Sequence, residues 1–248
     1  MRLISLFAIA ALAVAPVMAQ EHDAQHDPDQ HNQHDQHQGK YQPDADTEEP
    51  DGEGDRLHTF EETSRWVDMF ERPERAETQK PEEVVAALGL QPGQTVADVG
   101  AGTGYFTFHL AREVGSSGRI LAVDIEEGML EHIQERATKE EGGEIVETIL
   151  AAFDDPHLPD GQVDLVLFVN TYHHLSDRID YLNILKGDLK PGGRVAIVDF
   201  RKEDLPIGPP LSHKLSRQQV MEEFATAAFE QVAEETFLDY QYFLIFQP

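Results

Sequence analysis

Glycine occupies every second position from Gly100 to Gly104, directly after the strand-forming run Val96–Val99. This order predicts a buried strand, a tight turn and a helix start, where the missing side chains let a ligand approach the backbone. Dinucleotide sites use the spacing G-x-G-x-x-G, whereas this chain has G-x-G-x-G with Asp98 two positions ahead. A carboxylate there favours a ligand with an ammonium or sulfonium charge over one with phosphates. A purely structural turn is the alternative interpretation.

A second acid stands at the end of the next predicted strand, Arg119–Asp124. In doubly wound sheets an acid about 20 residues beyond the glycine turn binds ribose hydroxyls. The stretch Asp98–Gly104 and Asp124 together resemble the class I S-adenosylmethionine-dependent methyltransferases, where they match the first motif and the ribose-binding acid. The resemblance implies that S-adenosylmethionine is the cofactor.

Two further segments match that family in the expected order. Ala151–Gly161 resembles a family segment G-D-x-x-x-L-P, which implies that Asp154, or Asp155 one residue along, accepts from the adenine amino group. Phe153 replaces the family's glycine, and the alternative is that both acids cap backbone amides in a loop. Leu189–Arg194 resembles the family turn before the fifth strand.

The resemblance covers about residues 81–248 and implies an α/β fold. Its form is a doubly wound, seven-stranded, mostly parallel sheet of the Rossmann-like methyltransferase type, with an antiparallel last strand. The residue pattern also gives seven strands, with helices between the first five. Helices are predicted at 82–88, 105–114, 126–141, 177–188 and after the capping box 216–219, and closing strands at 229–237 and 240–246.

The continuous apolar strand Val163–Asn170 is typical of a parallel strand covered on both faces. Its carboxyl end, where open α/β sheets bind ligands, continues into Tyr172, His173 and His174. Methyl transfer mainly requires alignment of the nucleophile, and a hydroxyl or ammonium nucleophile also needs a general base. His173 or His174 is the candidate base. The alternative is that these three side chains only frame the pocket or hydrogen-bond the loop.

The predicted cofactor residues are Asp98, Gly100, Gly102, Gly104, Asp124, Ile125, Asp154, Asp155 and Asn170. The predicted contacts to a small-molecule substrate are Tyr172, Asp199, Arg201 and His213.

Charge, composition and one missing motif argue against several functions. A formal net charge of −28 repels nucleic acid and anionic lipid, and the stretch after Val169 lacks the D/N-P-P-Y/F tetrapeptide of nucleic-acid amino-methylating enzymes. The absence of Cys excludes mechanisms that need an enzyme thiol. The alternatives to a methyltransferase are a non-catalytic S-adenosylmethionine-binding homologue, a nucleotide-dependent oxidoreductase, which the glycine spacing disfavours, and an exported metal-binding protein.

Residues 1–19 have the pattern of a secretory signal peptide. Met1-Arg2 is positively charged, Leu3–Val14 is apolar, and Val17–Ala19 is a small-residue cleavage site. The apolar run is shorter than the about 20 residues that span a membrane. We therefore expect export to the periplasm without stable membrane insertion after cleavage.

Residues 20–58 are His-rich and acidic, and they contain too little apolar surface to offset the entropy of ordering. We predict a disordered segment whose imidazoles are candidate ligands for a divalent metal. These candidate ligands are His22, His26, His31, His34 and His37. Residues 59–80 are predicted to form an N-terminal amphipathic helix, Thr59–Glu71, and a connector, and residues 81–248 the methyltransferase domain.

Overall fold

A computed structural model describes Val67 and residues 71–248. The predicted signal peptide, the His-rich segment with its five candidate metal ligands, and nearly all of the predicted helix Thr59–Glu71 lie outside the described residues. Within the described residues, no helix has the length and apolar character to span a bilayer. The same part of the chain contains no group of three or more His, Asp or Glu side chains placed to hold a metal ion.

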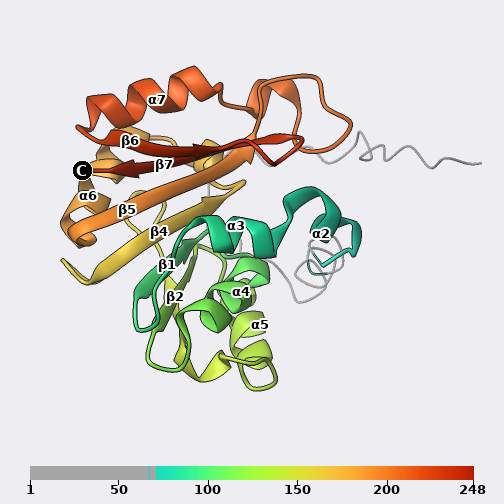
Figure 1. The fold of residues 1–248 in the computed structure, drawn as a ribbon, viewed down its shortest axis with the longest axis vertical. Helices are drawn as coiled ribbons and strands as arrows, with labels where there is room; N and C mark the ends of the chain where they lie inside the picture. Colours follow the sequence, from blue (N-terminus) through green and yellow to red (C-terminus); the bar gives the residue numbers. More distant parts are fainter. Residues whose placement is uncertain (1–66, 68–70) are drawn as a thin grey trace, which may run out of the picture. The chain divides into compact units, whose positions relative to one another are not determined.

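The strands of the described chain form one seven-stranded sheet in the order β3-β2-β1-β4-β5-β7-β6 (Figure 1). Their bounds are β1 Thr95–Val99, β2 Arg119–Asp124, β3 Val146–Leu150, β4 Val163–Val169, β5 Leu189–Phe200, β6 Glu230–Glu235 and β7 Gln241–Gln247. The first five strands pair in parallel, and β7 runs antiparallel to both β5 and β6. The sheet confirms the predicted fold class, and its strand order reverses between β1 and β4, where such sheets bind ligands.

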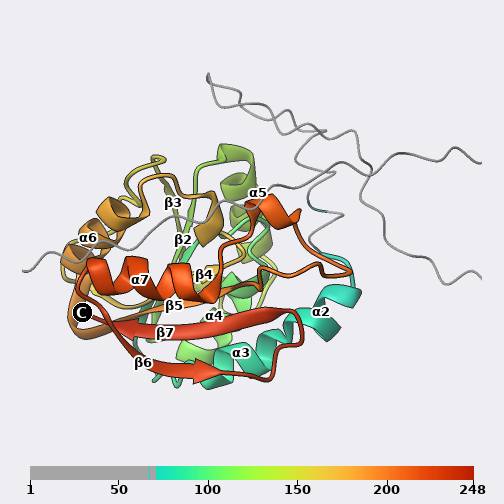
Figure 2. The ribbon, with the colours of Figure 1, turned by 90° about the horizontal axis from the view of Figure 1, so that it is seen from above.

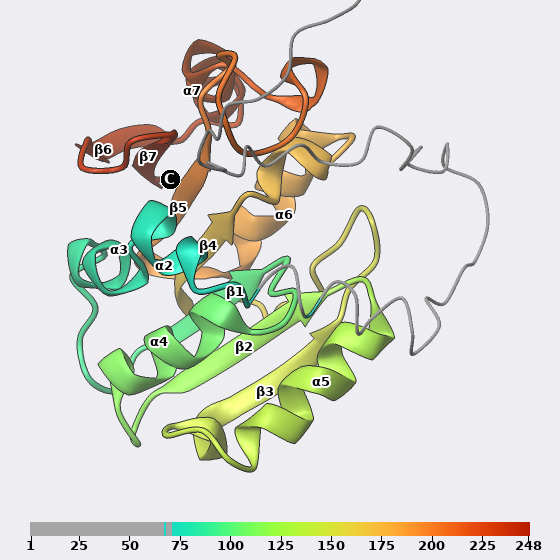
Figure 3. The ribbon, with the colours of Figure 1, turned by 90° about the vertical axis from the view of Figure 1, so that its right-hand side faces the viewer.

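The helices cover both faces of this sheet. Their bounds are α2 Glu74–Gln79, α3 Pro81–Ala87, α4 Tyr105–Val114, α5 Glu127–Ala137, α6 Arg178–Asp188 and α7 Arg217–Thr226. Apolar residues of α3, α4 and α5 pack on one face, and those of α6 and α7 on the other. Figure 2 shows α3 and α7 on opposite sides of β5 and β7, and Figure 3 shows α4 and α5 alongside β2 and β3.

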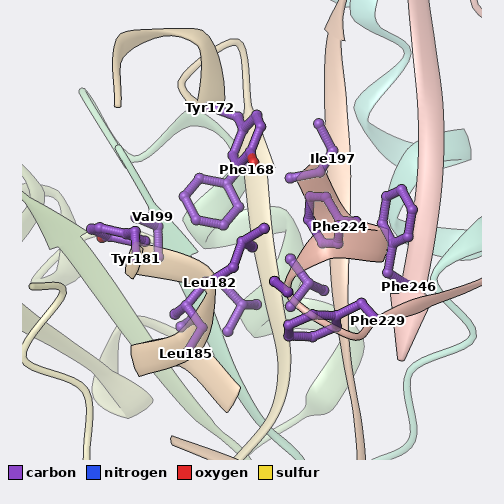
Figure 4. Packing of buried hydrophobic residues seen from close by; sticks show 14 of the residues in the cluster. Val99, Phe168, Tyr172, Tyr181, Leu182, Leu185, Ile197, Phe224, Phe229 and Phe246 are labelled. Atoms are coloured by element: carbon purple, nitrogen blue, oxygen red, sulfur yellow. The ribbon is translucent and has the colours of Figure 1, made fainter. Parts of the chain in front are cut away.

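Strand alternation assigns each strand-end side chain to one face. Ala97 and Val99 pack with the α6–α7 cluster and Val96 with the α3–α4 cluster, so Asp98 belongs to the α3–α4 face. On the α6–α7 face, the ring of Tyr172 contacts the rings of Phe168 and Phe224 in the aromatic core (Figure 4).

Two predictions of secondary structure were wrong. The expected connector after Pro73 contains helix α2, which has Glu74 and Glu77 in its first turn, where acids interact favourably with the helix dipole. The expected helix between β3 and β4 is absent, and residues 151–162 form a loop. Pro156 and Pro159 in that loop oppose a helix, because proline removes a backbone donor and clashes with the preceding turn.

Candidate functional site

The glycine turn after β1 has the backbone geometry that only glycine adopts readily. Gly100, Gly102 and Gly104 have φ of 73°, 54° and 80°, in the left-handed region. A Cβ on Gly100 would lie 2.2 Å from Cγ2 of Thr171. The loop after β1 is therefore packed directly against the loop after β4.

Asp124, at the end of β2, holds the glycine turn in place. Its Oδ2 accepts a hydrogen bond from the Gly102 amide at 2.8 Å, and its Oδ1 accepts one from the Glu126 amide at 3.0 Å. Burial raises the pKa of this carboxyl, against the lowering effect of the amide bonds. Each carboxylate oxygen can accept more than one hydrogen bond, so Asp124 can also accept from hydroxyl groups of a ligand. Ile125 follows it and is exposed.

Asp98 is more enclosed than an acid at the mouth of a cleft. It is 2% exposed, and its Oδ2 accepts from Oγ1 of Thr107 at 2.7 Å. Burial raises its pKa to about 6, Thr107 and the Arg75 charge oppose that rise, and the Asp124 charge adds to it. Asp98 and Asp124 each lie at or next to the carboxyl end of a strand, and β1 and β2 pair in parallel, so both acids lie at the same end of the sheet.

Three residues at this end had no predicted role. Arg75, on the unpredicted helix α2, places its guanidinium 4.2 Å from the ring centroid of Tyr105. Thr107 holds Asp98, and Thr103 has a buried hydroxyl with no hydrogen-bond partner among the described residues. The placement of Arg75 depends on how α2 packs, which no pattern within its own segment reveals.

The two candidate adenine-binding acids, in the loop after β3, differ in burial and in their contacts. Asp155 is half-buried, and its Oδ1 accepts from the His157 amide at 2.7 Å, which is the capping role that the alternative interpretation describes. Asp154 and the neighbouring Phe153 are exposed. The contact of Asp154 or Asp155 with an adenine stays a prediction.

The structure brings His173 and Asp199 together at the ends of β4 and β5. Nδ1 of His173 is 2.9 Å from both carboxylate oxygens of Asp199, and both side chains are almost fully buried. An ionised carboxylate only accepts hydrogen bonds, so Nδ1 donates to Asp199, and the lone pair of a neutral His173 ring is then on Nε2. The exposed His174 lies beside it, with ring centroids 4.1 Å apart and ring planes tilted by 39°.

The other predicted substrate contacts are placed differently. Tyr172 is fully buried, and its hydroxyl donates to Oε2 of Glu223 at 3.0 Å, so this structure places it in the core. Arg201 is half-buried, with Nη1 donating to the Leu238 carbonyl at 3.4 Å. His213 is exposed in a short 3-10 turn.

Two hydrogen-bonded groups tie the loop after β4 and its surroundings to distant strands and helices. Glu223 on α7 forms a bidentate ion pair with Arg178 on α6, with both N···O distances 2.8 Å. The predicted cofactor residue Asn170 accepts, through Oδ1, from Nε2 of Gln241 on β7 at 2.9 Å. Neither pair follows from a local pattern.

Comparison with known proteins connects this geometry to a family. Residues 90–243 match a family model described as a methyltransferase domain. A ubiquinone/menaquinone biosynthesis C-methyltransferase from an Enterobacter species is 33% identical over 124 residues, which are 50% of this chain and 48% of that protein. The chain thus spans about half the length of the curated relatives that it matches.

Solved structures extend the similarity. A SAM-dependent methyltransferase from Aquifex aeolicus is 30% identical, with a TM-score of 0.70 over 74% of this chain and 97% of its own. The cyclase SpnF, at 19% identity and a TM-score of 0.57 over 65% of this chain and 60% of its own, shares the fold alone.

Proposed function

The chain belongs to the class I S-adenosylmethionine-dependent methyltransferase family, and on that premise we propose that it transfers a methyl group from this cofactor to a small-molecule acceptor. One observation carries the proposal. The left-handed glycine turn is bound through the Gly102 amide to Asp124, beside the buried Asp98, at the end of the sheet where its strand order reverses.

The residues present fit the cofactor. Asp124 offers acceptors for ribose hydroxyls, and the charge of Asp98 suits a cationic amino-acid arm. No Lys or Arg occurs between residues 95 and 111, so the turn carries no basic side chain of its own. When bound, S-adenosylmethionine supplies an electrophilic methyl group on a sulfonium.

His173 is the general base of the proposed reaction. Its Nε2 accepts the proton of a hydroxyl or ammonium acceptor, which makes the acceptor atom nucleophilic. Asp199 fixes the ring orientation through Nδ1 and stabilises the imidazolium that forms. Arg201 and His213 remain candidate substrate contacts, and the acceptor is a small molecule because the acidic chain disfavours nucleic acid.

Calorimetry with S-adenosylmethionine and with NADH tests cofactor choice. We expect the full chain to bind the first and not the second, and Asp124→Asn to weaken the binding. Transfer of label from methyl-labelled cofactor into cell-envelope extract, and into a panel of phenols, quinols and amines, then tests activity. Binding of NADH alone would refute the proposal, and cofactor binding without any transfer would identify a non-catalytic homologue.

We further infer from the sequence that residues 1–19 direct export to the periplasm and that the His-rich segment binds a divalent metal. Cell fractionation tests the first inference. Zinc titration of the full chain, against a variant with the five candidate His residues replaced by Ala, tests the second. Identical titrations would exclude a metal site in that segment.

A further inference from the structure

The first two residues of β7, Gln241 and Tyr242, carry buried polar atoms without a partner. In the described part of the chain, four buried side-chain atoms lack a hydrogen bond, and two of them are Oε1 of Gln241 and Oη of Tyr242. The two side chains are 2% and 5% exposed. Buried polar groups are normally paired, because an unpaired one is costly. Two such atoms in consecutive residues therefore indicate a place where a molecule outside the chain completes the hydrogen bonding.

The two side chains point to opposite faces of the sheet, because successive residues of a strand alternate. Nε2 of Gln241 donates to Asn170, whereas Tyr242 packs in the α6–α7 cluster. Tyr242 pairs with Asp199 across the antiparallel strands β5 and β7. Side chains paired in this way share a face, with Cβ atoms about 4.5–5.5 Å apart. The unpaired hydroxyl therefore belongs to the direct neighbour of Asp199, the partner of the proposed base His173.

The carboxylate of Asp199 is already occupied by other donors. Both of its oxygens lie 2.9 Å from Nδ1 of His173, and Oδ1 also accepts from the Phe200 amide at 2.8 Å. Burial, and after it the charge of Asp199, raise the pKa of Tyr242 above its ordinary value of 10.0. The Tyr242 hydroxyl thus keeps its proton at neutral pH, and it is a donor that no described residue uses.

A second tyrosine on the same face shows the contrast with a hydroxyl that the fold uses. Tyr172 is 0% exposed, and its hydroxyl donates to Oε2 of Glu223 at 3.0 Å. Tyr242 belongs to the same buried cluster, but its hydroxyl bonds to nothing in it. Phenylalanine would fill the place of Tyr242 without burying an unpaired polar group. The hydroxyl of Tyr242 therefore has a use outside the packing of the core.

We propose that Tyr242 donates a hydrogen bond to the acceptor oxygen and so selects a hydroxyl compound, such as a phenol or quinol, over an amine. The inference rests on the proposed function, with His173 as the base. The acceptor hydroxyl gives its proton to Nε2 of His173, and its oxygen bonds to the methyl carbon as the carbon–sulfur bond breaks and leaves its electron pair on sulfur. Oxygen has another lone pair for the Tyr242 hydrogen. A neutral amine nitrogen has one lone pair, which the methyl carbon takes.

Acceptors that differ only in the reacting atom test this selection. The pairs are phenol with aniline and hydroquinone with 1,4-phenylenediamine, each assayed with the full chain and methyl-labelled cofactor. We expect the hydroxyl compound to be the better acceptor, and the ratio of kcat/KM for hydroxyl over amine to fall roughly 10- to 100-fold in Tyr242→Phe. Calorimetry should show unchanged affinity for S-adenosylmethionine. Tyr240→Phe, a half-buried tyrosine two residues earlier, is the matched control and should keep the ratio.

The ligand-free chain gives a readout that needs no acceptor. Tyr242→Phe removes a hydroxyl without a partner, so the melting temperature should stay within about 1 °C of the unaltered chain or rise. Tyr172→Phe removes a bonded hydroxyl from the same cluster and should lower the melting temperature by roughly 2–5 °C. Equal losses would show that the Tyr242 hydroxyl is bonded inside the protein, directly or through a buried water, and would overturn the inference.

The kinetic results separate contact with the acceptor from an indirect role. A loss in Tyr242→Phe that is equal for hydroxyl and amine acceptors would show that Tyr242 acts through Asp199, and it would overturn the inference, as would no loss or a better amine acceptor. If only cell-envelope extract is labelled, mass spectrometry of the product replaces the ratio, and a methylated nitrogen or carbon overturns the inference. All these results leave methyl transfer standing. Failure of the unaltered chain to methylate any acceptor would overturn the proposed function, and this inference with it.

Discussion

The two ends of the candidate site are assembled over very different distances in sequence. At the cofactor end, Thr107 holds Asp98 from 9 residues away, and Asp124 holds Gly102 from 22. At the acceptor end, the bonded partners are 26, 45, 51 and 71 residues apart: His173–Asp199, Arg178–Glu223, Tyr172–Glu223 and Asn170–Gln241. The first end is nearly a local structure, whereas the second exists only when β5, β7 and α7 are in place.

The sheet also separates the two ends by face. Asp98 alternates with Ala97 and Val99 and belongs to the α3–α4 face, whereas Asp199 follows the alternation of Ile197 and belongs to the α6–α7 face. The ends meet where Gly100 packs on Thr171. The proposed cofactor site on one face and the proposed base on the other can be perturbed separately, which the following variants exploit.

Replacement of His173 should have the largest effect and should be confined to the acceptor end. We expect His173→Ala to lower turnover about 10²- to 10⁴-fold, the usual contribution of a general base. The affinity for S-adenosylmethionine should be unchanged, because no cofactor-end residue is altered. Single-turnover rates and calorimetry would measure the two quantities.

His174→Ala is the matched control for that variant, since its ring is exposed and adjacent, whereas Asp199 holds the ring of His173. Its turnover should stay within about threefold of the unaltered chain. A larger loss for His174 than for His173 would reverse the assignment of the base, and unchanged turnover in both would remove it.

Gly100→Ala should damage both ends together. The new Cβ would meet the Thr171 side chain, and the residue would keep a φ of 73°. We expect a loss of roughly 2–5 kcal/mol in the free energy of unfolding, from left-handed strain and overpacking together. Gly161→Ala, with a φ of 64° and no atom within 4 Å of the new Cβ, is the control for strain alone. Equal losses in the free energy of unfolding for the two variants, measured by denaturant titration, would show that the loops after β1 and β4 are not closely packed against each other.

The sequence predicts the cofactor end because its residues are close together in the chain and their backbone needs are visible as glycines. The same reasoning finds β4, β5, His173 and Asp199 one by one. It cannot find that His173 rather than His174 faces Asp199, nor that Tyr172 turns into the core toward Glu223. Those choices are made by packing between α6, α7 and β7, which local periodicity does not encode.

Glu223→Gln tests whether the acceptor end can be weakened alone. The ion pair with Arg178 is largely buried, so removing one charge should lower the free energy of unfolding by about 1–3 kcal/mol. The affinity for S-adenosylmethionine should change less than about twofold, because these contacts lie on the α6–α7 face. Glu222→Gln, exposed on the same helix, should alter neither value. A loss of cofactor affinity in Glu223→Gln would contradict the separation of the two ends.

The smallest effect that we predict is a pH dependence specific to the cofactor end. Burial raises the pKa of Asp98 from 3.8 to about 6, so the ligand-free folded chain holds this proton more tightly than the unfolded chain. The stability that the proton contributes is complete below pH 3.8 and is lost as the pH rises through about 6. Cofactor affinity should change in the opposite direction, because the ionised carboxylate attracts the cationic arm.

We therefore expect the affinity for S-adenosylmethionine to fall roughly tenfold between pH 7 and pH 5, as the carboxylate becomes protonated. Calorimetry across this range would measure the change, and Asp98→Asn should remove it. His173→Ala should keep the full pH dependence, because that imidazole serves the acceptor and not the cofactor. If His173→Ala abolished the dependence and Asp98→Asn kept it, the charge that attracts the cofactor would belong to the acceptor end, and the two ends would have to be assigned anew.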